Sequence, residues 1–319
     1  MNIGDLHENI EMLAAKYLFY SSKCFSWSTA KLLAAGFLGA WCALTWGIAR
    51  AHVVEVKISS STVGTAEYEV GKSNLPAVLL LHGFLQTRDY PTLARLADAL
   101  EGLGYTTLSP TLSLGISKRA KSLPCEAIHR HNMGNDIAEL GLWIDWLANH
   151  GHRDIVLIGH SYGSLQILVY TTRHPNPAIR KIILLSLVDA DQDINIQKTR
   201  TSLQEIKHKM VQNDQSLAPY QLSYCQQYLS SARDYLSYAE WSRSRILNDL
   251  TRIKKPVSVI MGEKDDRMGV DWPNKMKLKG VDVTLVKGAN HFFEAEYEFE
   301  LVDIVAAQLR AINSVRVNK

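Results

Sequence analysis

The sequence predicts an α/β fold with a mostly parallel sheet and helices on both of its faces. Short strand-like runs alternate with amphipathic helical segments along most of the chain, as expected for parallel strands joined by helical crossovers. Residues 77–81 (AVLLL) are continuously apolar, which is typical of a strand buried on both faces. With 319 residues, of which 46% are hydrophobic, the chain is long enough to bury such a core.

The strand pattern occurs in short segments, which are residues 52–58, 65–70, 77–81, 105–108, 154–158, 182–188, 257–261 and 281–286. The first segment alternates between apolar and polar residues, and we expect it to pair antiparallel with the second. Apolar residues at helical spacing predict helices over residues 91–100, 134–149, 165–170 and 299–312.

Residues 190–250 interrupt this alternation. They carry no strand pattern, and they are rich in Gln, Ser, Tyr, Lys and Arg, with apolar side chains at helical spacing at Leu203, Ile206 and Met210. A structureless loop of that length is implausible inside a compact domain. We therefore expect a helical insertion between two core strands, which leaves the sheet at its carboxyl edge and covers that edge as a lid.

The N-terminal part contains a different kind of segment. Residues 32–49 are uncharged and mostly apolar, just long enough to cross a bilayer as a helix. Three lysines precede the segment, at positions 16, 23 and 31, and they favour an N-terminus in the cytoplasm. We expect residues 1–51 to be a leader and membrane anchor, and residues 52–319 to form a domain on the periplasmic or extracellular side.

Two other interpretations of the leader stay open. Ala49-Arg50-Ala51 has the small-x-small pattern of a signal-peptide cleavage site, which would release the domain as a secreted protein. The apolar segment could instead be a buried core helix. If the domain is exported, Cys125 and Cys225 lie in an oxidising compartment and could pair, although the sequence does not show whether they are close enough.

The composition excludes several classes of function. The formal net charge of +3 gives no electrostatic reason to expect nucleic-acid binding. The four cysteines have no C-x-x-C spacing and no Cys/His cluster, so no metal site is expected. A basic stretch formed by Lys118, Arg119, Lys121 and Arg130 has two interpretations, a solvated loop or a site for an acidic substrate group or lipid headgroup.

The clearest chemical signal is the pentapeptide G-H-S-Y-G at residues 159–163, which follows a predicted strand and precedes a predicted helix. In that context Ser161 sits on a sharp turn with its hydroxyl exposed above the sheet, while Gly159 and Gly163 let strand and helix pack closely. The turn also presents the backbone N–H of Tyr162 to an oxyanion. The alternative is a glycine-rich turn that carries no chemistry.

A serine hydroxyl needs a base, usually histidine, and a group that orients this base. Asp265 and His291 each follow one of the last two predicted strands, at the carboxyl edge where the serine turn also lies. Asp266 and Asp189 also follow strands and are alternative orienting groups.

A second oxyanion donor is expected after residues 77–81, where Gly83 permits a turn and the N–H of Phe84 faces the same site. The two histidines next to these turns, His82 and His160, are expected to be structural rather than catalytic.

Four motifs that occur in order, LLLHGF, IGHSYG, MGEKD and KGANHFF, resemble those of the α/β hydrolase family. The resemblance covers the chain from about residue 75 to its end, apart from the lid. It implies an eight-stranded type of sheet. It also implies that Ser161 is the nucleophile, His291 the base and acid, Asp265 its orienting group, and Phe84 and Tyr162 the oxyanion donors.

The same resemblance implies a serine hydrolase of the esterase, lipase or thioesterase kind, which cleaves small-molecule acyl substrates through an acyl-enzyme on Ser161 and needs no cofactor. An acyltransferase, a peptidase or a C–C hydrolase would use the same three side chains. A non-catalytic binding protein on this fold is the alternative from another class.

Overall fold

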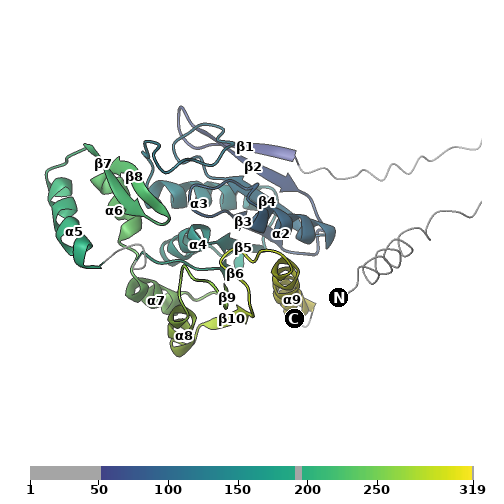
Figure 1. Cartoon of the computed structure of the whole chain (residues 1–319). Coiled ribbons are helices and arrows are strands. Elements are labelled where there is room, and N and C mark those ends of the chain that lie inside the picture. Colours follow the sequence, from purple (N-terminus) through teal and green to yellow (C-terminus); the bar gives the residue numbers. More distant parts are fainter. Residues whose placement is uncertain (1–51, 191–195, 318–319) are drawn as a thin grey trace, which may run out of the picture. The chain divides into compact units, whose positions relative to one another are not determined.

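A computed structural model of the chain describes residues 52–190 and 196–317, and over these the backbone forms an α/β domain (Figure 1). Eight strands make one sheet in the order β1-β2-β4-β3-β5-β6-β9-β10. Only β2 runs antiparallel to its neighbours, so the sheet is mostly parallel, as predicted. The strands are β1 (His52–Lys57), β2 (Val63–Glu69), β3 (Ala77–Leu81), β4 (Thr106–Thr111), β5 (Ile155–His160), β6 (Ile179–Leu185), β9 (Val257–Gly262) and β10 (Asp282–Val286).

Helices cover both faces of this sheet. They are α2 (Pro91–Gly102), α3 (Met133–Asn149), α4 (Tyr162–Arg173), α8 (Asp271–Leu278) and α9 (Tyr297–Val317). The short α8 was not predicted. Local chemistry sets where the helices begin, because α2 starts with a proline at its first position and the Asn132 side chain caps α3 by accepting the Asn135 N–H at 3.0 Å.

The two faces of the sheet have separate cores. In β3, Val78 and Leu80 pack with α2 and α9, whereas Leu79 and Leu81 pack with α3, α4 and the segment between β6 and β9. This alternation is the two-residue period of a strand. Burying each such leucine stabilises the fold by roughly 1.5–3 kcal/mol, so the continuous apolar run fastens both helix layers to the centre of the sheet.

The segment between β6 and β9, here called the insertion, contains α5 (Ile196–Val211), β7 (Leu217–Leu222), β8 (Cys225–Ser231), α6 (Ala232–Ala239) and α7 (Arg243–Arg252). The prediction of a purely helical insertion is wrong, since β7 and β8 form a two-stranded antiparallel sheet. Their sequences, LAPYQL and CQQYLSS, lack the β-branched residues that mark strands. Their pairing instead depends on contacts with the rest of the domain, where Cys225 and Tyr228 are fully buried.

A disulfide fastens this hairpin to the segment between β4 and α3. Cys125 and Cys225 are bonded, with their Cα atoms 5.3 Å apart and 100 positions apart in the sequence. Close by, the His129 N–H donates to the Leu229 carbonyl at 2.8 Å. The hairpin is therefore linked to the core both covalently and by a backbone hydrogen bond.

The apolar segment at residues 32–49 and the rest of the expected leader lie outside the described residues. Over the part of the chain that the structure describes, none of the helices combines the length and the apolar character that a bilayer crossing requires. The anchor and the boundary at residues 51 and 52 therefore stay predictions.

Candidate active site

The turn between β5 and α4 has the predicted strand–turn–helix geometry. Ser161 has φ 57° and ψ −122°, a conformation that costs energy for any residue except glycine. A Cβ on Gly163 would lie 2.3 Å from the Leu81 carbonyl oxygen, and a Cβ on Gly159 would lie 2.5 Å from the Gly163 backbone. Only glycine fits at both positions, which is why β3, β5 and α4 meet so closely under the serine.

The structure brings three of the predicted site residues into one hydrogen-bonded line. His291 Nε2 lies 3.0 Å from Ser161 Oγ, and His291 Nδ1 lies 2.8 Å from Asp265 Oδ2. All three side chains belong to buried residues, which are 8% (Ser161), 2% (His291) and 5% (Asp265) exposed. Because the carboxylate only accepts, the imidazole places its proton on Nδ1 and leaves Nε2 to accept the serine proton.

Asp265 is the aspartate that the geometry joins to His291. Its second oxygen, Oδ1, accepts the backbone N–H groups of Arg267 at 3.1 Å and Met268 at 3.3 Å, so both oxygens are held. The two alternatives lie elsewhere: Asp266 is exposed, and the carboxylate of Asp189 forms an ion pair with Arg243 at 2.8 Å.

Two groups fix the backbone of His291. Its carbonyl oxygen accepts from His160 Nε2 at 2.9 Å and from Ser186 Oγ at 2.8 Å. Burial, reinforced by the neighbouring His291, lowers the pKa of His160 to about 3. His160 is therefore neutral at ordinary pH and acts as a brace, in agreement with its predicted structural role.

His82 is also structural. Its Nε2 accepts the Leu112 N–H at 3.0 Å, so its Nδ1 carries the proton and donates to the Gly83 carbonyl at 2.8 Å. Burial, followed by the positive charge of Arg119, lowers the pKa of His82 to about 3. This neutral ring ties the loop that follows β3 to the end of β4.

The loop after β3 lies directly against the serine. A Cβ on Gly83 would be 3.3 Å from the Ser161 Cβ, and the Gly83 N–H donates to Gln86 Oε1 at 3.2 Å. The Phe84 ring packs on the Tyr162 ring, with centroids 4.7 Å apart. The loop after β3 and Tyr162 thus lie next to Ser161, and the role of the Phe84 and Tyr162 N–H groups as oxyanion donors stays a prediction.

The basic stretch after β4 contains one buried residue, Arg119. This residue fits neither the solvated loop nor the anion site that the sequence suggests. Arg119 is 4% exposed, and it donates to the carbonyls of Leu112 and Gln86, each at 2.7 Å. Burial lowers the pKa of Arg119 to about 10, so the guanidinium stays charged at neutral pH. Arg119 is neither solvated nor an anion site, because it braces the loop that carries Phe84.

A cavity of about 170 Å³ opens above the serine. Its walls come from the carboxyl edge of the sheet, from the loop after β9 and from the β7–β8 turn of the insertion. The lining residues are Ser161, Tyr162, Val188, Asp189, Ser223, Tyr224, Arg267, Met268 and His291. Sequence reasoning missed Tyr224 and Arg267, which belong to no motif. The only signal was their position, since Tyr224 precedes Cys225 and Arg267 lies two residues after Asp265.

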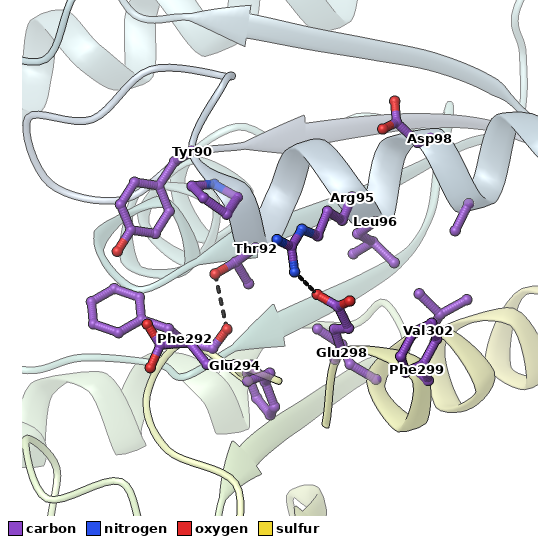
Figure 2. Close-up of a pocket in the computed structure, with 14 residues that line it drawn as sticks. Tyr90, Thr92, Arg95, Leu96, Asp98, Phe292, Glu294, Glu298, Phe299 and Val302 are labelled. Carbon is purple, nitrogen blue, oxygen red and sulfur yellow. Dashed lines mark hydrogen bonds and ion pairs between the residues drawn. The ribbon is translucent and has the colours of Figure 1, made fainter. Parts of the chain in front are cut away.

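A larger cavity, of about 330 Å³, lies between α2 and α9 (Figure 2). The Thr92 hydroxyl donates to the Phe292 carbonyl at 2.9 Å, and an ion pair joins Arg95 to Glu298 across the gap, as the dashed lines in Figure 2 mark. Its walls, which are mostly apolar, reach Phe292 but include none of Ser161, Asp265 and His291. Ser161 and His291 instead line the smaller cavity.

Over residues 52–190 and 196–317, the structure places no group of three His, Cys, Asp or Glu side chains where they could hold a metal ion.

Comparison with solved structures shows the same fold in several hydrolases. Est1E from Butyrivibrio proteoclasticus matches with a TM-score of 0.58 and 15% identity, over 81% of this chain and 99% of that one. An esterase of Pyrococcus furiosus matches with a TM-score of 0.58 and 16% identity, over 82% of this chain and 91% of that one. The thioesterase domain from the curacin biosynthetic pathway matches with a TM-score of 0.57 and 16% identity, over 81% of this chain and 99% of that one. At such low identity these likenesses describe the fold.

Sequence comparison adds the family. No curated protein matches the chain by sequence. A family model described as the alpha/beta hydrolase fold matches residues 76–231. The matched segment begins at β3 and runs through the serine turn to the end of β8, so the sequence match and the fold describe the same part of the molecule, and the chain belongs to the α/β hydrolase superfamily.

Proposed function

We propose that the protein is a serine hydrolase that cleaves carboxylic esters or thioesters of small acyl substrates. The observation that carries this proposal is the line of hydrogen bonds from Ser161 Oγ through His291 to Asp265, at 3.0 and 2.8 Å, with the serine on a strained turn. The fold and its esterase neighbours support a hydrolase in general. One of those neighbours, Est1E, is known with ferulic acid bound.

The mechanism follows from the geometry. Ser161 Oγ attacks the acyl carbon while His291 Nε2 takes its proton, and Asp265 stabilises the resulting imidazolium. The N–H groups of Phe84 and Tyr162 hold the developing oxyanion. His291 then gives the proton to the leaving alcohol or thiol. In the second half, His291 takes a proton from water, the hydroxide attacks the acyl-enzyme, and the acid leaves as the proton returns to Ser161.

The insertion is the proposed lid of this site. Its β7–β8 turn contributes Ser223 and Tyr224 to the cavity, and the Tyr224 hydroxyl donates to the Phe84 carbonyl at 3.1 Å. Binding sites for drug-sized ligands usually measure roughly 300–1,000 Å³. The cavity of about 170 Å³ above Ser161 is smaller, so we propose that short acyl groups are the preferred substrates.

We also propose that the domain works on the exported side of a membrane, anchored through residues 32–49. The disulfide between Cys125 and Cys225 supports this location, because such bonds persist in oxidising compartments. Thiol labelling of the protein taken directly from its native cells, with and without prior reduction, tests it. We expect both cysteines to be blocked until a reductant is added, and their immediate labelling would contradict export.

The decisive test of the chemistry is a fluorophosphonate probe with peptide mapping of the adduct. We expect labelling at Ser161 that is lost in Ser161→Ala and retained in the matched variant Ser223→Ala, whose serine lines the same cavity. Hydrolysis of short-chain esters should follow the same order. Folded protein that takes no label, even with the insertion shortened, would identify a non-catalytic binding protein on this fold.

A further inference from the structure

The cavity above Ser161 is lined by one charged side chain, Arg267, that forms no ion pair among the described residues. Asp189 and Arg267 are its charged lining residues besides the histidine of the triad. The carboxylate of Asp189 is paired with Arg243, whose other nitrogen atoms donate to the Met268 carbonyl at 2.7 Å and to Asp271 at 3.3 Å. Among the described residues, no carboxylate forms an ion pair with the guanidinium of Arg267.

Two aromatic rings hold that guanidinium in place. Its central carbon lies 4.9 Å from the centroid of the Phe292 ring and 5.8 Å from that of Tyr224. A guanidinium in contact with aromatic faces is attracted by them, and it keeps the N–H groups at its edge for a ligand. The backbone N–H of Arg267 also donates to Asp265, and Phe292 directly follows His291, so the exposed Arg267 side chain and the ring beside it come from the two loops that carry Asp265 and His291.

On its outer side Arg267 meets a second cavity, of about 440 Å³, that it shares with His291. The other charged residues there are Lys264, Asp266 and Glu294, and the Glu294 carboxylate already accepts from the Asn290 amide at 2.5 Å. Two positive and two negative charges therefore balance in this outer cavity. In the serine cavity the one carboxylate, Asp189, is already paired with Arg243, so this is the side on which Arg267 can attract an anion.

We propose that Arg267 binds an anionic group of the substrate, and that the enzyme prefers short esters or thioesters carrying a carboxylate. This inference rests on the proposed function of Ser161. Both residues line one small cavity, so a carboxylate a few bonds from the scissile carbonyl reaches the guanidinium while Oγ attacks the acyl carbon. A guanidinium binds a carboxylate with two parallel hydrogen bonds, which would also fix the orientation of the substrate.

Two pairs of substrates test this preference in the full-length protein. Methyl hydrogen glutarate and methyl pentanoate differ only in a carboxylate or a methyl group at the end of the acyl chain. On the alcohol side, 3-acetoxypropanoate and propyl acetate likewise differ only in a carboxylate or a methyl group at the end of the chain. Proton release at constant pH gives kcat/KM for each ester. We expect the charged member of at least one pair to be favoured roughly ten- to a hundredfold, as hydrogen bonds to a charged group allow.

Arg267→Gln should remove most of that preference, so that the ratio of kcat/KM between the charged and the neutral member of the pair falls toward one. Arg267→Lys keeps the charge but not the planar fork, so it should restore part of the preference. Lys264→Gln is the matched control, because Lys264 is a cation of the outer cavity that does not line the serine cavity. Free glutarate should inhibit hydrolysis of methyl pentanoate competitively, and more weakly in Arg267→Gln.

The possible failures are distinguishable. Hydrolysis of the neutral esters without a preference in either pair, or a preference that survives Arg267→Gln, would overturn the role of Arg267 and leave the hydrolase intact. Absence of both ester hydrolysis and fluorophosphonate labelling would instead remove the proposed function, and the substrate preference with it.

Discussion

The two walls of the serine cavity are held by different means. One wall comes from the carboxyl edge of the sheet and carries Ser161, Asp265 and His291, on backbone that packs at the closest distances glycine permits. The other is the β7–β8 turn with Tyr224, whose hydroxyl donates to the Phe84 carbonyl and whose ring lies edge-on to the Phe84 ring, with the disulfide nearby. The first wall is over-determined by the core, whereas the second depends on a few contacts.

Because of this difference, we expect the sheet wall to govern the reaction rate and the insertion wall to govern substrate preference. Where β9 ends, a Cβ on Gly262 would lie 2.4 Å from the carbonyl oxygens of Ala289 and Asn290, so the loop that carries His291 has no room to shift. On the insertion wall, by contrast, Tyr224 is 45% exposed. Changes in the sheet wall should therefore lower kcat or stability, and changes in the insertion wall should mainly alter KM and substrate preference.

The largest effect is expected for Asp265→Asn. The amide would present a donor to His291 Nδ1, which favours the wrong imidazole tautomer, and kcat should fall roughly 10³- to 10⁴-fold with the thermal midpoint little changed. Steady-state hydrolysis of a short ester measures this. Asp266→Asn is the control, because Asp266 is adjacent and exposed. An equal loss in the control would transfer the orienting role to Asp266.

Removing the disulfide should have the next largest effect, and it tests whether the insertion wall is the weaker one. Replacing Cys125 and Cys225 by serine opens a covalent link across 100 positions, which should lower the free energy of unfolding by about 4 kcal/mol. Denaturant unfolding gives the magnitude, and hydrogen exchange shows where it acts. We expect faster exchange in β7 and β8 and retained exchange protection in β5. Faster exchange throughout the sheet would contradict the separation of the walls.

Gly163→Ala tests the rigidity of the sheet wall. The new methyl group would meet two backbone oxygens, of Leu81 and His82, at 2.3 and 2.5 Å, so the free energy of unfolding should drop by about 3 kcal/mol. Gly102→Ala is the control in α2, where nothing lies within 4 Å, and it should be neutral or stabilising by up to about 1 kcal/mol. Equal stabilities of the two variants would show that the turn can relax.

Tyr224→Phe should have the smallest effect. It removes the hydroxyl that donates to the Phe84 carbonyl and keeps the ring beside Arg267. One such hydrogen bond is worth about 1 kcal/mol, so kcat/KM should fall about fivefold, mainly through KM. Ester kinetics and fluorophosphonate labelling measured together check this. A large loss of kcat would instead show that Tyr224 helps to hold the loop after β3, which carries Phe84, in its reactive position.

The sheet wall could be predicted from the sequence, whereas the insertion wall could not. The sheet strands could be predicted because runs such as Ala77–Leu81 are apolar on both faces, and the serine turn because Gly159 and Gly163 are required by backbone sterics. The order Ser161, Asp265, His291 followed from strand ends at one edge. In each case the local sequence and the tertiary structure favour the same conformation.

The insertion could not be predicted in this way. Pro219 and the glutamines of β7 and β8 oppose a strand assignment, and the hairpin exists because Tyr228 and Cys225 are buried against residues about a hundred positions away. The roles of Tyr224 and Arg267 arise from the cavity they share with Ser161, which no spacing along the chain reveals.

The backbone of Ser161 has a consequence for any attempt to improve this protein. A φ of 57° with ψ −122° costs a serine about 1–3 kcal/mol, whereas glycine adopts it without penalty. Ser161→Gly should therefore be more stable than the natural protein, while it lacks the side chain that we propose as the nucleophile. A laboratory selection for heat resistance alone would reward that loss, so screens on this scaffold must demand turnover in every round.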